Sequence, residues 1–427
     1  MRILLTTILI LLTGLPLGVR AQAPQPVTLE TAMGSAVERH PTVVAAVESL
    51  RAAEARAVAA RAGSAVAVTA NARASLGTIT TTGSPTGGGV GTSHDVSVGA
   101  TYSLYDGGLR ALQIAQAQAA VDAAQAAVVA ARQDIAIAAG QAYFTVLRAQ
   151  RTVEVREATL RAARAQVEQA DAFVRAGTGA RADVIRAQAT AATAQADLVT
   201  AQGQVEINVV QLRSAMAVPV TQSVTVAEPG APVLVVLAPA DAASQAVRDR
   251  AEIRRIDADV RNAEVALRIA EIQAGLFVTV NASGAVQVSP NPGQAGWGLG
   301  ANVSFPILDG GAAKAQVAAA RATLAATQAR REATVLQVQT QAYQAAAGAR
   351  DTNARLEATR VSVTAADESL RVAEGRYRAG VGTLLEVLDA QTLATQARIN
   401  ALQALYDLHL AIVNLQYSLG QPLVRRS

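Results

Sequence analysis

The sequence contains no cysteine, and aromatic residues make up only 3% of its 427 positions, with a single tryptophan. The absence of cysteine excludes disulfide bonds, thiolate metal sites and an acylated lipoprotein cysteine. Globular cores usually depend on bulky side chains, so a chain this long and this poor in aromatics must pack mainly through small residues. Abundant alanine lets long helices approach closely, which favours a thin-walled helical assembly over a sphere.

Histidine and clustered charge are scarce as well. The three histidines, His40, His94 and His409, lie far apart in the sequence, and the carboxylates lack the spacing of metal ligands or of a catalytic triad. The formal net charge is only +4, and arginine is spread along the chain rather than gathered in a basic patch. We therefore predict no enzyme activity, no metal, no cofactor and no nucleic-acid partner.

Apolar runs long enough to cross a membrane are missing beyond the N-terminus. Residues 3–17 are apolar and follow Met1-Arg2, which is typical of a secretory signal, so we predict a signal peptide over 1–21. No later apolar run reaches the roughly 18 residues of a membrane helix. The remaining chain is expected either to be soluble outside the inner membrane or to insert as β-strands.

A segment at 175–188, Arg-Ala-Gly-Thr-Gly-Ala-Arg-Ala-Asp-Val-Ile-Arg-Ala-Gln, returns at 378–391 as Arg-Ala-Gly-Val-Gly-Thr-Leu-Leu-Glu-Val-Leu-Asp-Ala-Gln. The chain is therefore a duplication. In both copies an alanine-rich helical pattern enters a pair of glycines and a second helical pattern leaves it. Glycine just after a helix accepts the left-handed conformation that ends it, so each pair predicts the tip of a helical hairpin.

Two stretches of the chain switch to a period of two. Apolar and polar residues alternate over the predicted hairpins 65–105 and 277–306, which predicts four strands of about 9 to 11 residues, the length of membrane-spanning β-strands. A soluble, half-buried sheet stays open as the alternative. If the strands do span a membrane, several chains must share one barrel, because four strands cannot close a barrel and lipid tolerates no open edge.

The full organisation follows from these patterns. A first repeat is expected over 22–218, a proline-rich linker over 219–239, a second repeat over 240–422 and a C-terminal tail over 423–427. The first repeat contains a helix over 28–62 interrupted at Pro41, the hairpin 65–105, a long helix 108–175 and a return helix 181–217. The second contains a helix 241–275, the hairpin 277–306, a long helix 311–378 and a return helix 384–418. Each long helix would measure roughly 100 Å, and two shorter helices stacked end to end would match it.

Four features together resemble the TolC family of outer-membrane efflux proteins. They are Thr28-Leu-Glu-x-Ala32 ending in His40-Pro41, the repeated Asp-Gly-Gly at 106–108 and 309–311, Gln141-Ala-Tyr-Phe144, and the two Ala-Gly-x-Gly tips. The resemblance implies a mainly α fold with a membrane β-barrel: a homotrimer whose strands close a 12-stranded barrel in outer-membrane lipid, continued by a 12-helix tunnel through the periplasm. It also implies a periplasmic adaptor and an inner-membrane pump of the RND, ABC or MFS type, serving efflux or type I secretion.

Site residues follow from the same resemblance. Glu386 and Asp389 match an acidic pair at the tunnel entrance, and Asp183 and Tyr377 match positions that link neighbouring hairpins and hold the entrance shut. Gly382 stands where some relatives carry a gating arginine, so that part of the latch is absent. A plain helix-capping role for the acidic residues stays open, because the first turn of a helix favours negative charge.

Two further sets of residues are expected to face partners. The tips should contact the adaptor through Gly177, Thr178 and Gly179 in the first copy and Gly380, Val381 and Gly382 in the second. Aromatics at strand ends should form a membrane girdle, namely Tyr102, Phe277, Trp297 and Phe305.

Two other protein classes stay open on sequence alone. A periplasmic adaptor also uses long helical hairpins, but it would carry lipoyl-like and soluble β-barrel modules around one hairpin. A soluble coiled-coil structural protein would have no use for four alternating strands. The cargo, whether drug, metal, polysaccharide or protein, is not encoded in any of these patterns.

Overall fold

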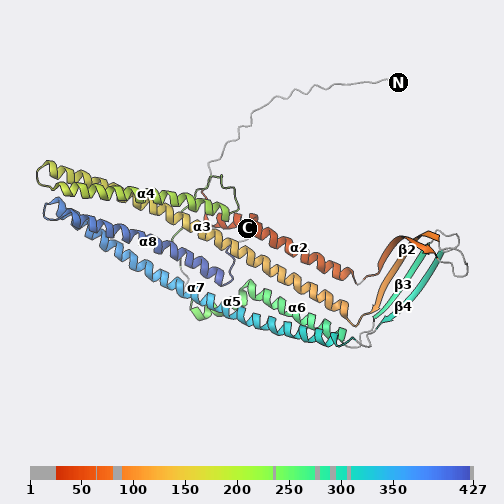
Figure 1. Cartoon of the computed structure of the whole chain (residues 1–427). Coiled ribbons are helices and arrows are strands. Elements are labelled where there is room, and N and C mark those ends of the chain that lie inside the picture. Colours follow the sequence, from red (N-terminus) through yellow and green to blue (C-terminus); the bar gives the residue numbers. More distant parts are fainter. Residues whose placement is uncertain are drawn as a thin grey trace, which may run out of the picture.

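The computed structural model describes residues 26–63, 65–79, 89–233, 237–274, 279–288, 295–304 and 309–423. The predicted signal peptide and residues 424–427 of the predicted tail lie outside these ranges. The molecule is long and narrow, with a small sheet at one end and two helical hairpin tips at the other (Figure 1).

The elements repeat the same order twice, as a pair of short helices, two strands, a long helix and a return helix. The first copy contains α1 (Leu29–Arg39), α2 (Pro41–Ala62), β1 (Ala67–Ile79), β2 (Gly89–Tyr105), α3 (Leu109–Arg175) and α4 (Arg181–Ala215). The second contains α5 (Pro239–Asp249), α6 (Ala251–Ala274), β3 (Thr279–Val288), β4 (Ala295–Ser304), α7 (Ala312–Arg378) and α8 (Leu384–Ser418). Among the described helices, none is both long and apolar enough to cross a membrane.

The two long helices run the length of the helical body and the shorter ones fill in beside them (Figure 1). In the half nearer the sheet, α3 packs on α2 and α6, and α6 packs on α7. In the half nearer the tips, α3 packs on α4 and α8, and α8 packs on α7. The layer is therefore four helices wide throughout, with α3 in its interior and α7 at one edge.

Each long helix begins at an Asp-Gly-Gly turn. In the first copy, Asp106 accepts hydrogen bonds from the backbone N–H groups of Gly108 and Arg110 at 3.0 and 3.1 Å. Asp309 does the same for Gly311 and Ala313 at 2.9 and 2.7 Å. The aspartate thereby satisfies backbone donors that the first helical turn leaves unpaired.

The short helices before each hairpin are broken in both copies. Thr28 caps α1, and His40 separates α1 from Pro41 of α2. The single helix expected over 241–275 is wrong, because Arg250 has an extended ψ of 138° and separates α5 from α6. No proline marks this second break.

Packing holds the break in place instead. The nearly buried Arg250 guanidinium pairs with Glu252, donates to Gln341 Oε1 at 2.6 Å, and lies 5.0 Å from the Tyr417 ring centroid. These three partners come from three helices, so the break is fixed by tertiary contacts.

The core is concentrated near mid-height, where the linker crosses the helices. Tyr143, Phe144 and Tyr406 are almost completely buried there. The Tyr143 hydroxyl donates to the carbonyl of Ala227 in the linker at 2.5 Å, and burial raises the pKa of Tyr143 to about 12. The Gln-Ala-Tyr-Phe motif therefore packs the linker against the helical layer.

The strands form one antiparallel sheet in the order β1-β2-β3-β4, so β1 and β4 are its edges. The register keeps apolar residues opposite one another: Ala70 faces Val98, Val98 faces Val286, and Val286 faces Trp297. Near the helical end, the register shifts between Ser103 and Tyr105. Tyr105 therefore lies opposite Val280, where continuation of the preceding pairs would place Leu104.

One helix end carries a residue that fits its backbone poorly. After α4, Ala217 has a φ of +53°, and it is the one non-glycine residue with positive φ in the described ranges. Its N–H donates to Ser214 O, and that of Val218 to Arg213 O, both at 3.0 Å, the bonding that normally places glycine at this point.

Ala217→Gly should therefore stabilise the protein by about 0.5–1 kcal/mol, because glycine adopts the left-handed conformation without the clash of a Cβ. The measurement is the midpoint of thermal unfolding of the purified protein. Ala176→Gly is the matched control: Ala176 ends α3 with a helical φ of −76°, so glycine there should lower the midpoint. An unchanged or lower midpoint for Ala217→Gly would refute this account of strain.

Candidate functional site at the hairpin tips

Both tips are built from the same helix-ending motif. In the first, the N–H groups of Thr178 and Gly177 donate to the carbonyls of Phe173 and Val174, each at 3.0 Å. In the second, Val381 and Gly380 donate to Arg376 and Tyr377, again at 3.0 Å. These bonds satisfy the last carbonyls of α3 and α7 and require a left-handed residue at the first glycine.

The two glycines of each tip are needed for different reasons. Gly177 and Gly380 have φ values of +79° and +74°, with open space where a Cβ would lie. Gly179 and Gly382 lack positive φ, but a Cβ on either would come within 2.9 Å of the Cβ of Phe173 or Arg376. Between the glycines, Thr178 and Val381 are exposed at the apex.

Tyr377 joins the two hairpins close to their tips. Its ring meets that of Phe173 edge-on, with centroids 5.3 Å apart, so α7 of the second hairpin contacts α3 of the first. Tyr377 is buried in an apolar cluster with Leu384 and Val387 of α8. Burial, with a smaller effect from the negative charge of Asp183, raises the pKa of Tyr377.

Asp183 lies near Tyr377 but uses its carboxylate elsewhere. Its Oδ1 is 3.6 Å from a guanidinium nitrogen of Arg186, one turn later on α4. Among the described residues, no hydrogen bond joins Asp183 to Tyr377. Within one chain, the predicted link between Asp183 and Tyr377 is therefore an electrostatic effect on a buried phenol, not a hydrogen bond.

Within the predicted acidic pair, one carboxylate, that of Glu386, has a cation nearby. Glu386 Oε2 lies 3.7 Å from Arg376 Nε, which reaches across the tip from the end of α7. The backbone N–H of Glu386 also donates to Thr383 Oγ1 at 3.3 Å, which caps α8. Asp389 is exposed, and no ion pair involves it in the part of the chain that the structure describes. Glu386 thus has a nearby cation, whereas Asp389 has none within the described residues.

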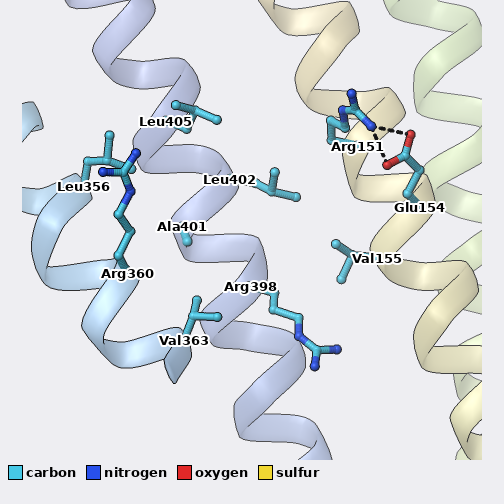
Figure 2. Close-up of a pocket in the computed structure, with 10 residues that line it drawn as sticks. All are labelled: Arg151, Glu154, Val155, Leu356, Arg360, Val363, Arg398, Ala401, Leu402 and Leu405. Atoms are coloured by element: carbon cyan, nitrogen blue, oxygen red, sulfur yellow. Dashed lines mark hydrogen bonds and ion pairs between the residues drawn. The ribbon is translucent and has the colours of Figure 1, made fainter. Parts of the chain in front are cut away.

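Two grooves lie on opposite faces of the helical layer, on the sheet side of the tips. The first, of about 350 Å³, runs over α8 between α3 and α7 and is lined by residues including Arg151, Leu402 and Arg398 (Figure 2). Because Arg151 also pairs with Glu228 of the linker, we call it the linker-side groove.

The second groove, of about 480 Å³, lies between α4, α3 and α8 and includes Thr152 and Gln403. We call it the far-side groove. On α8 the linker-side groove uses Ala401 and Leu405, whereas the far-side groove uses Ile399 and Gln403. Residues two apart on a helix point about 200° apart, so the grooves occupy opposite faces. Asp389 precedes Gln403 by about four turns and lies on the far side.

The decisive observation comes from comparison with known families. A family profile described as outer membrane efflux protein matches residues 32–218 and 242–421. The chain belongs to the outer membrane efflux protein family. It is a passive channel of the bacterial outer membrane that extends into the periplasm, and neither an adaptor nor a soluble coiled coil is favoured.

Individual relatives of this efflux protein are distant. Nodulation protein T of Rhizobium leguminosarum bv. trifolii is 24% identical over 329 residues, which span 74% of this chain and 70% of the relative. The outer-membrane channel OprN matches with a TM-score of 0.82 at 21% identity, over 92% of this chain and 90% of its own. The outer membrane protein VceC of Vibrio cholerae gives a TM-score of 0.80 at 20% identity, over 92% and 96%. These structures share the fold of TolC-like channels.

The predicted girdle of this channel is described only in part. Tyr102 is exposed on β2, and the Arg110 guanidinium lies 5.8 Å from its ring centroid. Trp297 lies in β4. Phe277 and Phe305 lie outside the described residues.

Sequence reasoning missed the linker contact of the efflux protein. Glu228 accepts a hydrogen bond from the Tyr406 hydroxyl at 2.9 Å and pairs with Arg151 at 2.8 Å. The partners are more than 70 positions away along the chain, so no local pattern marks them. A lone glutamate beside Pro229 was the available signal.

Proposed function

We propose that three copies of this chain form a closed 12-stranded β-barrel in the outer membrane and a 12-helix tunnel below it. The tunnel receives cargo at the tips from a periplasmic adaptor and an inner-membrane pump of the RND, ABC or MFS class, for efflux or type I secretion. The face carrying the linker is turned outward, and the far-side groove lines the lumen.

The sheet carries this proposal. Its two edge strands, β1 and β4, have no neighbour within the described chain. Its apolar face is also uncovered, since Val68 is 68% exposed and Val98 and Leu76 are exposed too. In lipid an apolar face is favourable but an open edge is not, because unpaired backbone groups find no water there. Three such sheets placed edge to edge satisfy both conditions.

The helical body supports the same assembly. Exposed large apolar residues lie along α4 (Ile185, Val199, Ile207 and Val210) and along α7 (Leu336, Tyr343, Val361 and Val372). These two helices form the edges of the layer nearer the tips. Tyr343 is 53% exposed and is available to a second copy.

The tip residues take their roles from this assembly. Around a threefold axis, Glu386 and Asp389 form an acidic ring at the entrance, and Asp183 and Tyr377 hold neighbouring hairpins together. The apical turns, with Gly177 to Gly179 and Gly380 to Gly382, meet the adaptor. Tyr102, with Phe277, Trp297 and Phe305, forms the membrane girdle.

Protein extracted in mild detergent should elute as a trimer by size exclusion with light scattering. Leu336→Asp with Val361→Asp should shift it toward monomer, because two charges would be buried at each α4–α7 contact. Val220→Asp, at an exposed linker position, is the matched control and should leave the trimer intact. A monodisperse wild-type monomer would contradict the proposed barrel.

A further inference from the structure

The far-side groove is more polar than the linker-side groove. It runs along α3 between α4 and α8 and is lined by threonine, glutamine, asparagine, arginine and one aspartate together with a few small apolar side chains. Ala149, Ala201 and Ile399 supply the apolar part. A surface of this composition can hold a molecule that has both a charged group and an apolar body.

Charge in and beside the groove is unevenly neutralised. Asp407 approaches Arg355 of α7 to 2.5 Å but stays 3.9 Å from Arg148 of α3. The Arg148 side chain is 40% exposed, whereas that of Asp407 is 23% exposed. Asp407 is therefore committed to Arg355, and Arg148 keeps donors free for another acceptor.

The second arginine of the groove is better paired. Arg156 lies two turns after Arg148 on α3, and its guanidinium is 2.9 Å from Asp197 of α4. Three arginines thus face two aspartates, which leaves an excess of one positive charge per chain, centred on Arg148.

Neighbouring groups complete a binding surface around Arg148. Gln403 is exposed, and its amide makes no hydrogen bond within the described residues, so it can donate. Thr152 donates its hydroxyl to the Arg148 carbonyl at 2.8 Å, which keeps that helical turn fixed. An anion at Arg148 would therefore find a guanidinium, an amide donor and the apolar Ile399 side by side.

We propose that this groove is a transit site for organic anions, meaning carboxylates, sulfonates or phosphate esters attached to an apolar body. The assignment rests on the proposed function, because only in the closed trimer does the groove face the lumen. Three copies then form a cationic belt above the acidic entrance.

The test is single-channel recording of the purified trimer in a planar bilayer, with naphthalene-1-sulfonate added on the side of the hairpin tips. Wild-type channels should show transient current interruptions. Arg148→Gln should shorten their residence time by about tenfold or more, the usual loss when a charged hydrogen-bond partner is removed. Asp407→Asn should lengthen them, since it removes the negative charge 3.9 Å from Arg148 and the carboxylate partner of Arg355.

Three controls separate charge from folding. Arg148→Lys should recover part of the residence time, and naphthalen-1-ylmethylammonium should not respond to Arg148→Gln. Arg360→Gln removes an arginine from the linker-side groove and should leave the interruptions unchanged (Figure 2).

The outcomes distinguish failure of the transit site from failure of the proposed duct. Equal residence times in wild type and Arg148→Gln, with normal trimer and conductance, would overturn the transit site and leave the duct standing. Wild-type channels without interruptions would do the same. Failure of the trimer to conduct at all would overturn both.

Discussion

Replacing Gly177 and Gly380 together by leucine should abolish export while leaving the trimer and its barrel intact. Both glycines have positive φ, and a Cβ at either position would meet no atom within 4 Å. The new side chains would therefore project from the apex instead of disrupting the hairpin. Each tip would tolerate a strain of about 1–2 kcal/mol, but the docking surface for the adaptor would carry six bulky groups in the trimer.

Gly348→Leu is the matched control, because Gly348 lies within α7, about 140° around the helix from the exposed Tyr343, and a Cβ there is also unobstructed. It should export normally and unfold at the same or a higher temperature, since leucine favours helix more than glycine does. Export is measured as efflux or secretion in cells carrying the cognate pump and adaptor. Wild-type export by the double leucine variant would show that the tips do not contact the adaptor.

The second glycine of each tip should behave differently. Gly179→Ala and Gly382→Ala would each bring a Cβ within 2.9 Å of another Cβ, so the hairpin itself must open. These variants should lower thermal stability as well as export. The contrast between apex and closing glycines separates a lost docking surface from a lost fold.

The sequence predicts the elements of this fold because their signals are local. The alternation that defines β1 to β4, the Asp-Gly-Gly turns and the glycine pairs each act within a few residues of their position. The structure has long helices from Leu109 to Arg175 and from Ala312 to Arg378, against the predicted 108–175 and 311–378. Duplication strengthens these assignments, because each signal occurs twice at matching places.

Contacts between distant segments explain what could not be predicted. The break at Arg250 depends on Gln341 and Tyr417, and no proline or glycine lies at the break to predict it. The pair between Arg376 and Glu386 forms only because the tip folds back and brings two helix ends together. From the sequence, charges can be compared only within one helical turn. Such a comparison does not find Arg376 as the partner of Glu386.

The pair between Arg376 and Glu386 changes the ion binding that we expect at the entrance. Glu386 must leave Arg376 before it can coordinate an ion, whereas Asp389 is exposed and unpaired in the described chain. In the proposed trimer, three Asp389 carboxylates around the axis would repel one another, and a multivalent cation would relieve that repulsion. We therefore expect cation-selective conductance in planar bilayers, blocked from the tip side by trivalent cations.

Glu386→Ala with Asp389→Ala should abolish the trivalent block and lower cation selectivity. Asp389→Asn alone should weaken the block by about tenfold or more, because a freely accessible carboxylate at an ion site contributes most of the attraction. Glu386→Gln should have a smaller effect, since its charge is already offset by Arg376.

Arg376→Gln tests the same argument in the opposite direction. It frees Glu386 to join Asp389, so the block should become stronger than in wild type. Asp183→Ala should leave the block unchanged and instead raise the resting conductance, because the charge beside Tyr377 acts on closure rather than on ion binding. If selectivity and block both survive in the double alanine variant, the two carboxylates only stabilise the start of α8, and the entrance is set by the packing of Phe173 against Tyr377.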